Sequence, residues 1–444
     1  MGVERKRTMM QHGWRWMAMV GLSVCGAVAR GGDQGGTAGA SGVEAPVARQ
    51  SFVDEREART FKNLVRLTSP KDYFKAGEAY MDTDGHWVVF QAVEMEAGVD
   101  AAVLKTRPYA MFVASVGRGA DGRIKGLDPA IRISAPGSAN TCGYFHPSQP
   151  AIVIFGSTLE PYARPEGDAA GFSRDKQRYV WEFPERMRVS RRRVKQVMEY
   201  YLPKIGRAPD DGADPPAAAL FEQPGYSAEC AFSPTGRFVV YTNVNPETRD
   251  GDIWVYDMLK ETRVPLVTAK GYDGGPFFSP DGKRICYRSD RKGDGNLQIF
   301  VADLVQEPST FGTEGEEILG AITGIERERA VTDNGHVNWA PFWHPSGEFL
   351  VYATSEVGHD NYEVFSVEAP VGDREGVKPE GLRRRRMTFA AGFDGLPSFS
   401  KDGKWMLWTS QRPAGPGGQP AAADPSLGRI ESQVWAAEVI DAAP

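Results

Sequence analysis

Hydrophobic and polar residues follow one repeated pattern in four stretches of this chain. Each stretch has an aromatic residue, then a short turn that ends in Gly, then a strand in which apolar and polar residues alternate. The four stretches are 231–241, 277–287, 342–352 and 398–408. Alternation with a period of two is typical of a half-buried strand, and a turn such as Pro280-Asp281-Gly282 closes a hairpin. Each stretch therefore predicts a β-hairpin.

Two further strands accompany each hairpin. Apolar alternation predicts a third strand at 252–257, 298–303, 362–367 and 433–438. A fourth, shorter strand precedes the next unit at 266–268, 330–332 and 386–388. Four antiparallel strands are the content of one propeller blade. The long segments 306–320 and 371–386, rich in Gly, Glu, Pro and Arg, are expected to be surface loops.

Two weaker copies of the pattern lie upstream and bring the expected number of blades to six. One spans 141–155, where Gln149 replaces the turn glycine, and the other spans 80–90, with further strands at 111–114 and 132–134. The last unit lacks a fourth strand, and a spare copy stands at 65–68. We predict an all-β, six-bladed β-propeller of four-stranded antiparallel blades over 59–444, with this N-terminal strand closing the last blade.

The repeats resemble those of the TolB-type six-bladed propellers of the periplasm. The resemblance covers about 60–440 and rests on an Arg/Leu-Thr strand followed by Phe-Ser-Pro-Asp-Gly-Lys, as at 278–283. It implies a role in periplasmic interactions and leaves the partner open.

The N-terminus has the features of an export signal. Basic residues precede an apolar run at 17–28, and Ala27-Val28-Ala29 has the A-x-A form of a cleavage site. We expect a signal peptide at 1–29 and a flexible linker at 30–58, which places the protein in the periplasm or outside the cell. The segment 22–25 also resembles a lipoprotein box, so a lipid anchor at Cys25 is the alternative and the one expected link to a membrane.

Charge and motifs narrow the function. A net charge of −6 argues against nucleic acid as a partner. The sequence has no G-x-S-x-G elbow, H-E-x-x-H, paired C-x-x-C or P-loop, so no catalytic residue is predicted. After cleavage Cys142, Cys230 and Cys286 remain; either the first two form a bridge or all three are small buried side chains.

Short polar residues recur five positions before the aromatic residue of each turn. If the first strand of each blade is innermost, they form a ring at one mouth of the central channel, with two glutamates one layer deeper and a histidine nearby. The ring is Asn140, Ser227, Asp273, Asn338 and Asp394; the others are Glu78, Glu229 and His336. Such residues could bind a cation, a partner's Lys or Arg, or a sugar. Alternatively, they bond local backbone and shape the turns.

Two functions remain open. The first is an exported, non-catalytic scaffold that binds a protein or cell-envelope component, without a cofactor. The second is a metal-assisted lyase or hydrolase of envelope or extracellular polysaccharide that uses the channel-mouth carboxylates, with calcium or magnesium as the metal.

Overall fold

The computed structural model describes residues 54–163, 171–173, 178–180, 184–206, 214–313, 315, 317–414 and 431–444. Contacts divide the chain into two units, 1–49 with 308–320 and 50–307 with 321–444. In the first, β20 (Thr310–Phe311) and β21 (Glu317–Ile318) form a short hairpin. The predicted signal peptide, Cys25 and most of the predicted linker lie outside the described residues.

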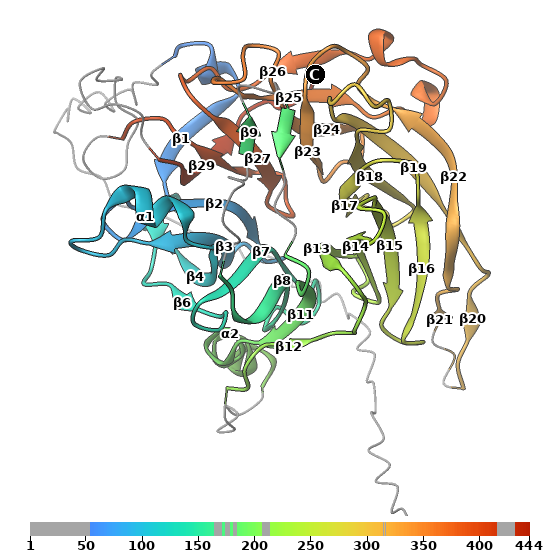
Figure 1. Ribbon diagram of the computed structural model, residues 1–444, viewed down its shortest axis with the longest axis horizontal. Coiled ribbons are helices and arrows are strands. Elements are labelled where there is room, and N and C mark those ends of the chain that lie inside the picture. The colour runs from blue at the N-terminus through green and yellow to red at the C-terminus, as the bar shows by residue number, and fades with distance from the viewer. Residues whose placement is uncertain are drawn as a thin grey trace, which may run out of the picture. The chain divides into compact units, whose positions relative to one another are not determined.

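The second unit is a six-bladed β-propeller, as predicted (Figure 1). Blade 1 contains β2 (Tyr73–Met81), β3 (Trp87–Glu94), β4 (Ala110–Arg118), β5 (Ile124–Leu127) and β6 (Ile131–Arg132). Blade 2 contains β7 (Ser138–Phe145), β8 (Ile152–Pro161), β11 (Arg188–Arg193) and β12 (Ala218–Ala219). Blade 3 contains β13 (Tyr226–Phe232), β14 (Phe238–Val244), β15 (Gly251–Asp257) and β16 (Thr262–Val267).

The remaining blades complete the ring. Blade 4 contains β17 (Asp273–Phe278), β18 (Arg284–Ser289), β19 (Gln298–Gln306) and β22 (Ile322–Ala330). Blade 5 contains β23 (Asn338–Trp343), β24 (Phe349–Thr354), β25 (Glu363–Glu368) and β26 (Arg384–Arg386). Blade 6 contains β27 (Asp394–Phe399), β28 (Trp405–Ser410), β29 (Gln433–Val439) and, from the other end of the chain, β1 (Phe61–Arg66).

The predicted closure is confirmed. β1 pairs antiparallel with β29, with Val65 opposite Ala436 and Arg66 opposite Trp435. Phe61 is fully buried and stacks on Trp408, with ring centroids 5.3 Å apart. Both ends of the chain therefore belong to one sheet, in which β1 covers the edge that β29 would otherwise expose.

Helices are short and lie between the strands. They are α1 (Ala101–Thr106), α2 (Lys195–Tyr201), η1 (Glu57–Arg59), η2 (Leu202–Ile205), η3 (Gly372–Arg374) and η4 (Pro379–Gly381). A further hairpin pairs β9 (Gly171–Ser173) with β10 (Arg178–Val180). Within the described residues no helix has the length and apolar character needed to cross a bilayer.

The turn that repeats in sequence is held by its first residue. In the Ser-Pro-Asp-Gly turn of blade 4, the Ser279 hydroxyl accepts a hydrogen bond from the backbone N–H of Arg284 at 2.9 Å and donates to Asp281 at 2.5 Å. Gly282 has φ +71°, a conformation in which glycine carries no steric penalty. In blade 5 a histidine replaces the serine, and His344 Nδ1 accepts from the backbone of Ser346 at 3.2 Å.

The outer strands end earlier in the chain than predicted. The sequence placed them at 330–332 and 386–388, whereas β22 ends at Ala330 and β26 at Arg386. The Thr that marks the repeat lies beyond the strand, where its hydroxyl accepts a hydrogen bond from the second backbone N–H of the third strand. The Ile299 N–H donates to Thr332 at 2.9 Å, and the Val364 N–H donates to Thr388 at 2.9 Å. These threonines are buried caps between strands, which explains their regular recurrence.

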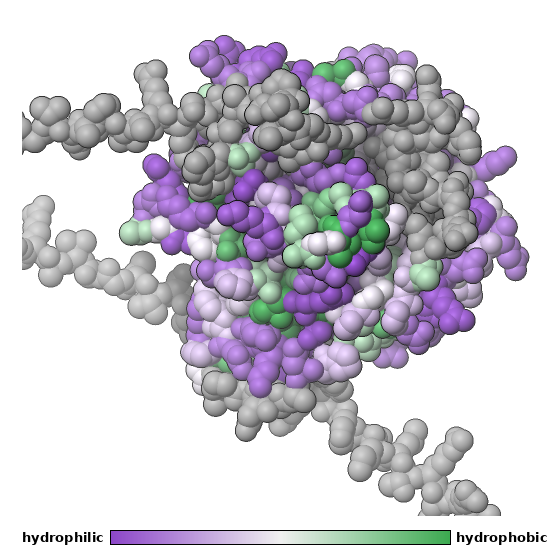
Figure 2. Space-filling view, turned by 60° about the vertical axis from the view of Figure 1, so that its left-hand side comes forward, coloured by the Kyte–Doolittle hydropathy of each residue, from purple (hydrophilic) through white to green (hydrophobic). Residues whose placement is uncertain are grey.

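The space between neighbouring blades is filled by apolar side chains from both. Between blades 6 and 1, for example, Leu407 and Ala436 pack with Phe90 and Ala76, all at 0% exposure. The outer surface seen in Figure 2 is mainly hydrophilic, with apolar residues in small patches.

Candidate functional site

The innermost strand of every blade carries the same distortion. In all six blades, pairing with the second strand shifts register at an equivalent point, which is a β-bulge; blades 1 and 2 have one further shift each. The first residue of each bulge has a positive φ, between +48° and +59°. These residues are Glu78, Cys142, Glu229, Gly275, Ala340 and Leu396. A non-glycine residue in this region costs about 1 kcal/mol or more, and such strain is typical of functional sites.

The bulges surround a small cavity on the axis of the propeller. Its volume is about 20 Å³, room for a single water-sized group. We call this region the waist; it is lined by the bulge residues together with Tyr80, Cys230, Phe277, Arg288, Pro341 and Pro397. The waist gathers acidic, basic and apolar groups from all six blades.

Aromatic rings form the next layer of the channel. Tyr80, Tyr144, Phe277 and Phe342 each lie two residues after a bulge, and their ring centroids are 5.0–6.0 Å apart. Blades 3 and 6 have Ala231 and Ser398 at the equivalent position. The four rings close this layer of the channel, so the waist ends in an aromatic floor.

Glu229 is fully satisfied by protein groups. Its carboxylate accepts from the Tyr272 hydroxyl at 2.6 and 2.7 Å, the Gly275 backbone at 2.7 Å, Arg288 at 3.0 Å and Thr242 at 3.1 Å. An added Cβ at Gly275 would lie 2.0 Å from Arg288 Nη1, so glycine is required for this close approach. The result is a rigid, charge-balanced cluster on the blade 3 side of the waist.

Glu78 occupies the equivalent position in blade 1 but has poorer partners. It is 8% exposed, and its oxygens lie 3.5 Å from both the Tyr80 and Thr141 hydroxyls. Its third partner is the Cys142 thiol, a weak donor. Hydroxyl groups normally bond carboxylates at about 2.5–3.0 Å, so these contacts are weak. Burial, with the nearby charge of Glu229, raises the pKa of Glu78 above its ordinary value. The waist thus contains one satisfied and one under-satisfied carboxylate.

The thiol of Cys142 and the tyrosine hydroxyls beside the glutamates stay neutral at ordinary pH. Burial raises the pKa of the Cys142 thiol well above its usual value, and the carboxylates of Glu78 and Glu229 add to the effect. Burial likewise raises the pKa of the Tyr80 and Tyr272 hydroxyls. A neutral thiol is a poor nucleophile, so these groups act as hydrogen-bonding walls.

The residues of the predicted polar ring lie beside the waist, at the seams between blades. Asn140, Ser227, Asp273, Asn338 and Asp394 are all at most 4% exposed. Asn140 donates to the Tyr109 carbonyl at 2.9 Å, and Asn338 donates to Gln298 at 3.0 Å. Ser227 accepts from Asn243 at 3.0 Å. These side chains bond the same or the preceding blade, and a role for them in ligand binding stays a prediction.

The two aspartates of the ring form ion pairs. Asp273 lies 3.0 Å from Arg291, and Asp394 lies 2.6 Å from Arg412. His336 is exposed in the loop before β23. Of the predicted site residues, the structure therefore brings Glu78 and Glu229 together at the waist and places the other six around it.

Sequence reasoning missed the polar groups that accompany the two glutamates: Cys142 and Arg288 of the waist, and Tyr272, which bonds Glu229. Arg288 lies in β18, where an arginine fits the expected alternation of polar and apolar positions. It is only 7% exposed, however. An arginine within a strand gives no local signal of burial, and its partner Glu229 lies 59 residues away in the sequence.

Cysteines and metal ligands complete the inventory. Cys142, Cys230 and Cys286 are free thiols, so the bridge between the first two is absent from the structure. In the part of the chain that the structure describes, no three His, Cys, Asp or Glu side chains are grouped to hold a metal ion.

Comparison with known proteins gives distant matches. No family model matches the chain. It is 24% identical over 207 residues to the uncharacterized peptidase YuxL of Bacillus subtilis, covering 40% of this chain and 28% of that protein. It is 25% identical over 152 residues to the uncharacterized protein Atu1656 of Agrobacterium fabrum, covering 34% and 44%. The chain thus spans less than half the length of these curated relatives.

Solved structures with a similar fold include two TolB proteins and a lyase. A protein assigned as TolB from Agrobacterium tumefaciens is 13% identical, with TM-score 0.44 over 85% of this chain and 97% of that one. TolB from Acinetobacter baumannii is 14% identical, with TM-score 0.43 over 80% of each. Oligogalacturonate lyase from Vibrio parahaemolyticus is 11% identical, with TM-score 0.40 over 86% and 94%. The six-bladed propeller expected from the repeats is confirmed by the strand pairing; likeness at these identities and TM-scores assigns no activity.

Proposed function

We propose that this protein is an exported, non-catalytic binding scaffold whose waist receives one primary ammonium group, such as a lysine side chain, from a partner protein of the cell envelope. We place it in the periplasm or outside the cell, held to a membrane only if Cys25 is lipidated. The proposal rests on one observation, the difference between Glu229 and Glu78. The first carboxylate is saturated by five contacts of 2.6–3.1 Å, whereas the second has two hydroxyl contacts of 3.5 Å and the weakly donating thiol of Cys142.

Charge and size favour an ammonium group. With both glutamates ionised, Arg288 balances one of them, and the waist carries one excess negative charge. The 20 Å³ cavity fits a group the size of water, which an ammonium group is and a guanidinium is not. The aromatic floor adds cation–π attraction, which is worth about 0.5–2 kcal/mol. A partner's lysine would complete the hydrogen bonding of Glu78.

The test compares small cations as probes. Methylammonium chloride should raise the melting temperature of the full chain more than tetramethylammonium or sodium chloride at equal ionic strength, because only the first is small enough and donates hydrogen bonds. Glu78→Gln should remove the difference. Glu348→Gln, which removes an exposed carboxylate outside the channel, is the charge-matched control and should retain it.

Proton competition gives a second readout. Since the pKa of Glu78 is raised, protons compete with the ammonium group, and methylammonium binding should strengthen as pH rises. This dependence should vanish in Glu78→Gln. Equal effects of all three salts on wild type and Glu78→Gln would refute the proposal.

The metal-assisted polysaccharide lyase or hydrolase stays a prediction, and no observation at the waist favours it. A shift in melting temperature with calcium or magnesium that is lost in Asp273→Ala or Asp394→Ala would revive it.

A further inference from the structure

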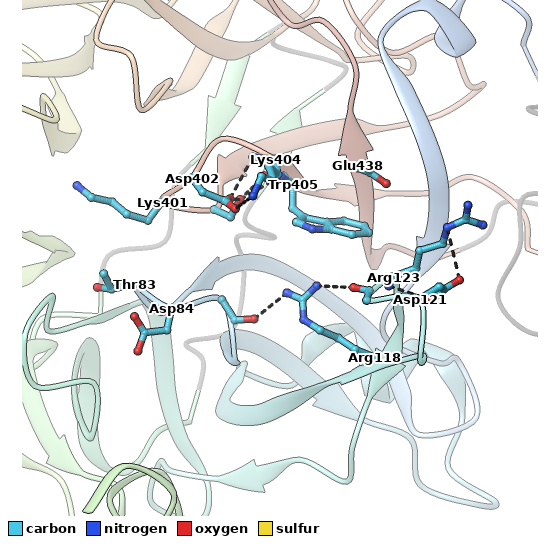
Figure 3. A pocket seen from close by; sticks show the side chains of 13 residues that line it. Thr83, Asp84, Arg118, Asp121, Arg123, Lys401, Asp402, Lys404, Trp405 and Glu438 are labelled. Atoms are coloured by element: carbon cyan, nitrogen blue, oxygen red, sulfur yellow. Dashed lines mark hydrogen bonds and ion pairs between the residues drawn. The ribbon is translucent and has the colours of Figure 1, made fainter. Parts of the chain in front are cut away.

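A second cavity lies at the seam where the propeller closes, between blades 6 and 1. Its volume is about 410 Å³, within the range typical of small-ligand sites. Its walls are the β2–β3 turn at 83–85, the β4–β5 turn at 118–123, the β27–β28 turn at 400–404, and Glu438 of β29. Figure 3 shows these side chains around the opening, with Arg118 and Trp405 near its middle. We call this cavity the seam groove.

Three of the four carboxylates that line the seam groove already have partners, and the fourth, Asp84, is exposed to solvent. Asp402 accepts from Ser400 at 2.7 Å and pairs with Lys404 at 3.2 Å. Glu438 pairs with Lys62 at 2.7 Å. Asp121 accepts from the backbone of Arg123 at 3.1 Å and lies 3.5 Å from its guanidinium. These carboxylates therefore have little need of a further cation.

Arg118 differs from these paired groups. Its guanidinium donates to two carbonyl oxygens, Gly85 at 2.9 Å and Gly122 at 3.0 Å, and lies 5.7 Å from the centre of the Trp405 ring. Among the described residues no carboxylate forms an ion pair with it. Carbonyl groups fix the plane of a guanidinium without cancelling its charge. Arginine has five N–H donors, so three remain for a ligand. Lys401, exposed at the rim, adds a second positive charge.

We infer that the seam groove binds the carboxylate group of a small or peptide ligand, held by Arg118. A positioned guanidinium matches a carboxylate bidentately. The ligand carries a single negative charge at this point. A polyanion, such as a polyuronate or nucleic acid, would meet the carboxylates of Asp84, Asp121, Asp402 and Glu438 on the same walls. The C-terminus of a peptide and a free carboxylic acid both supply the required group.

The experiment measures binding by calorimetry to the full chain with three probes: acetate, N-acetylglycylglycine and its C-terminal amide. The free-acid peptide should bind and the amide should not. A peptide acid that binds more tightly than acetate assigns the site to peptide termini, whereas equal affinity assigns it to small carboxylic acids. Equal affinity of the acid and the amide would overturn the inference.

Variants locate the site. Arg118→Gln should weaken binding of the free acid about tenfold or more, and Arg118→Lys should weaken it less because the charge remains. Lys401→Gln changes an exposed residue and leaves Arg118 in place; it should weaken binding of the free acid about two- to threefold. Unchanged affinity in both Arg118→Gln and Lys401→Gln would refute the site.

Arg263 provides a matched control. It too donates to a backbone carbonyl, that of Glu222, and lies 5.3 Å from an aromatic ring, Phe221, but in blade 3. Arg263→Gln should leave binding unchanged, and a loss equal to that of Arg118→Gln would show a general charge effect instead. Glu78→Gln should also bind the peptide acid normally, so the outcome at the seam groove does not depend on the function proposed for the waist.

Discussion

Blades 4 and 6 contain the same ion-pair arrangement in two different settings. In each, an arginine just after the second strand bonds two side chains. One is an aspartate at the start of the first strand, and the other is the serine two residues before the arginine. In blade 4 these are Arg291, Asp273 and Ser289, with distances of 3.0 and 2.8 Å. In blade 6 they are Arg412, Asp394 and Ser410, with distances of 2.6 and 3.0 Å. The repeat therefore reproduces a structural device as well as a strand pattern.

The two arrangements differ in their third partner. In blade 4 it is Glu328 of the outer strand, and the arginine side chain is 21% exposed. In blade 6 it is Glu57, which precedes β1 at the other end of the chain and accepts from Arg412 at 2.9 and 3.0 Å. Arg412, Asp394 and Glu57 are each 1% exposed. The local ion pair is half-open to solvent, whereas the one that closes the ring is buried and joins both ends of the chain.

Replacing the arginine should separate the two settings most strongly. Arg412→Met leaves two buried carboxylates without a positive charge beside them and should lower the free energy of unfolding by about 3–5 kcal/mol. Arg291→Met leaves Glu328, which water reaches, and one buried carboxylate, Asp273, which keeps the backbone N–H of Ala269 at 3.0 Å; it should therefore cost less, about 2 kcal/mol. Urea unfolding of both variants measures the difference. Equal losses would mean that burial at the closure adds nothing.

Replacing the glutamate tests whether the N-terminal segment carries the difference. Glu57→Gln weakens a buried charge-assisted contact with Arg412 and another with the backbone of Phe389 at 2.7 Å, and should cost about 2 kcal/mol. Glu328→Gln, at a 30% exposed side chain, should cost less than about 1 kcal/mol. Limited proteolysis near residue 57 should be faster in Glu57→Gln alone. Unchanged cleavage would mean that the β1–β29 pairing, and not Glu57, holds the N-terminal segment in place.

Much of this comparison was predictable from sequence. Alternating strands, turn glycines and threonine caps are local features, and they predicted six blades and the pairing of both chain ends. The buried role of Glu57 was not predictable, because its partners lie more than 330 residues away and nothing in its neighbours marks it as part of the propeller.

The waist shows a different limit. Prediction of the polar ring assumed regular inner strands, in which Ser227 and Glu229 point the same way. The bulge at Glu229 breaks that alternation, so Glu229 faces the channel whereas Ser227 lies at the seam between blades. Five of the six bulge residues are not glycine, and a sequence gives no warning of a positive φ at Glu, Cys, Ala or Leu.

The pH dependence of stability should sharpen the contrast at the blade 6 seam. Burial, with the neighbouring charge of Asp394, raises the pKa of Glu363 to about 9. A carboxyl whose pKa is higher in the folded chain holds its proton there longer than in the unfolded chain. Its contribution is therefore complete below its ordinary pKa of 4.5 and is lost as pH rises toward 9. Above neutrality, the free energy of unfolding should therefore fall less steeply with pH in Glu363→Gln than in wild type, by up to about 1 kcal/mol per pH unit. Parallel curves for wild type and Glu363→Gln would show that Arg386, 2.6 Å away, keeps this carboxyl ionised.

The smallest expected effect concerns the serine shared by both arrangements. Ser410→Ala removes the acceptor for the Arg412 Nε–H, which burial keeps from water, and should cost about 1 kcal/mol. Ser289→Ala removes the same contact from Arg291, but water can replace the hydroxyl at a guanidinium that is 21% exposed, so the cost should be about half as large or less. Because the two serines have the same geometry, the ratio of these losses in urea unfolding measures burial alone. A ratio near one would mean that the closing blade owes its stability to packing around Trp408 and Trp435 rather than to the seclusion of its charges.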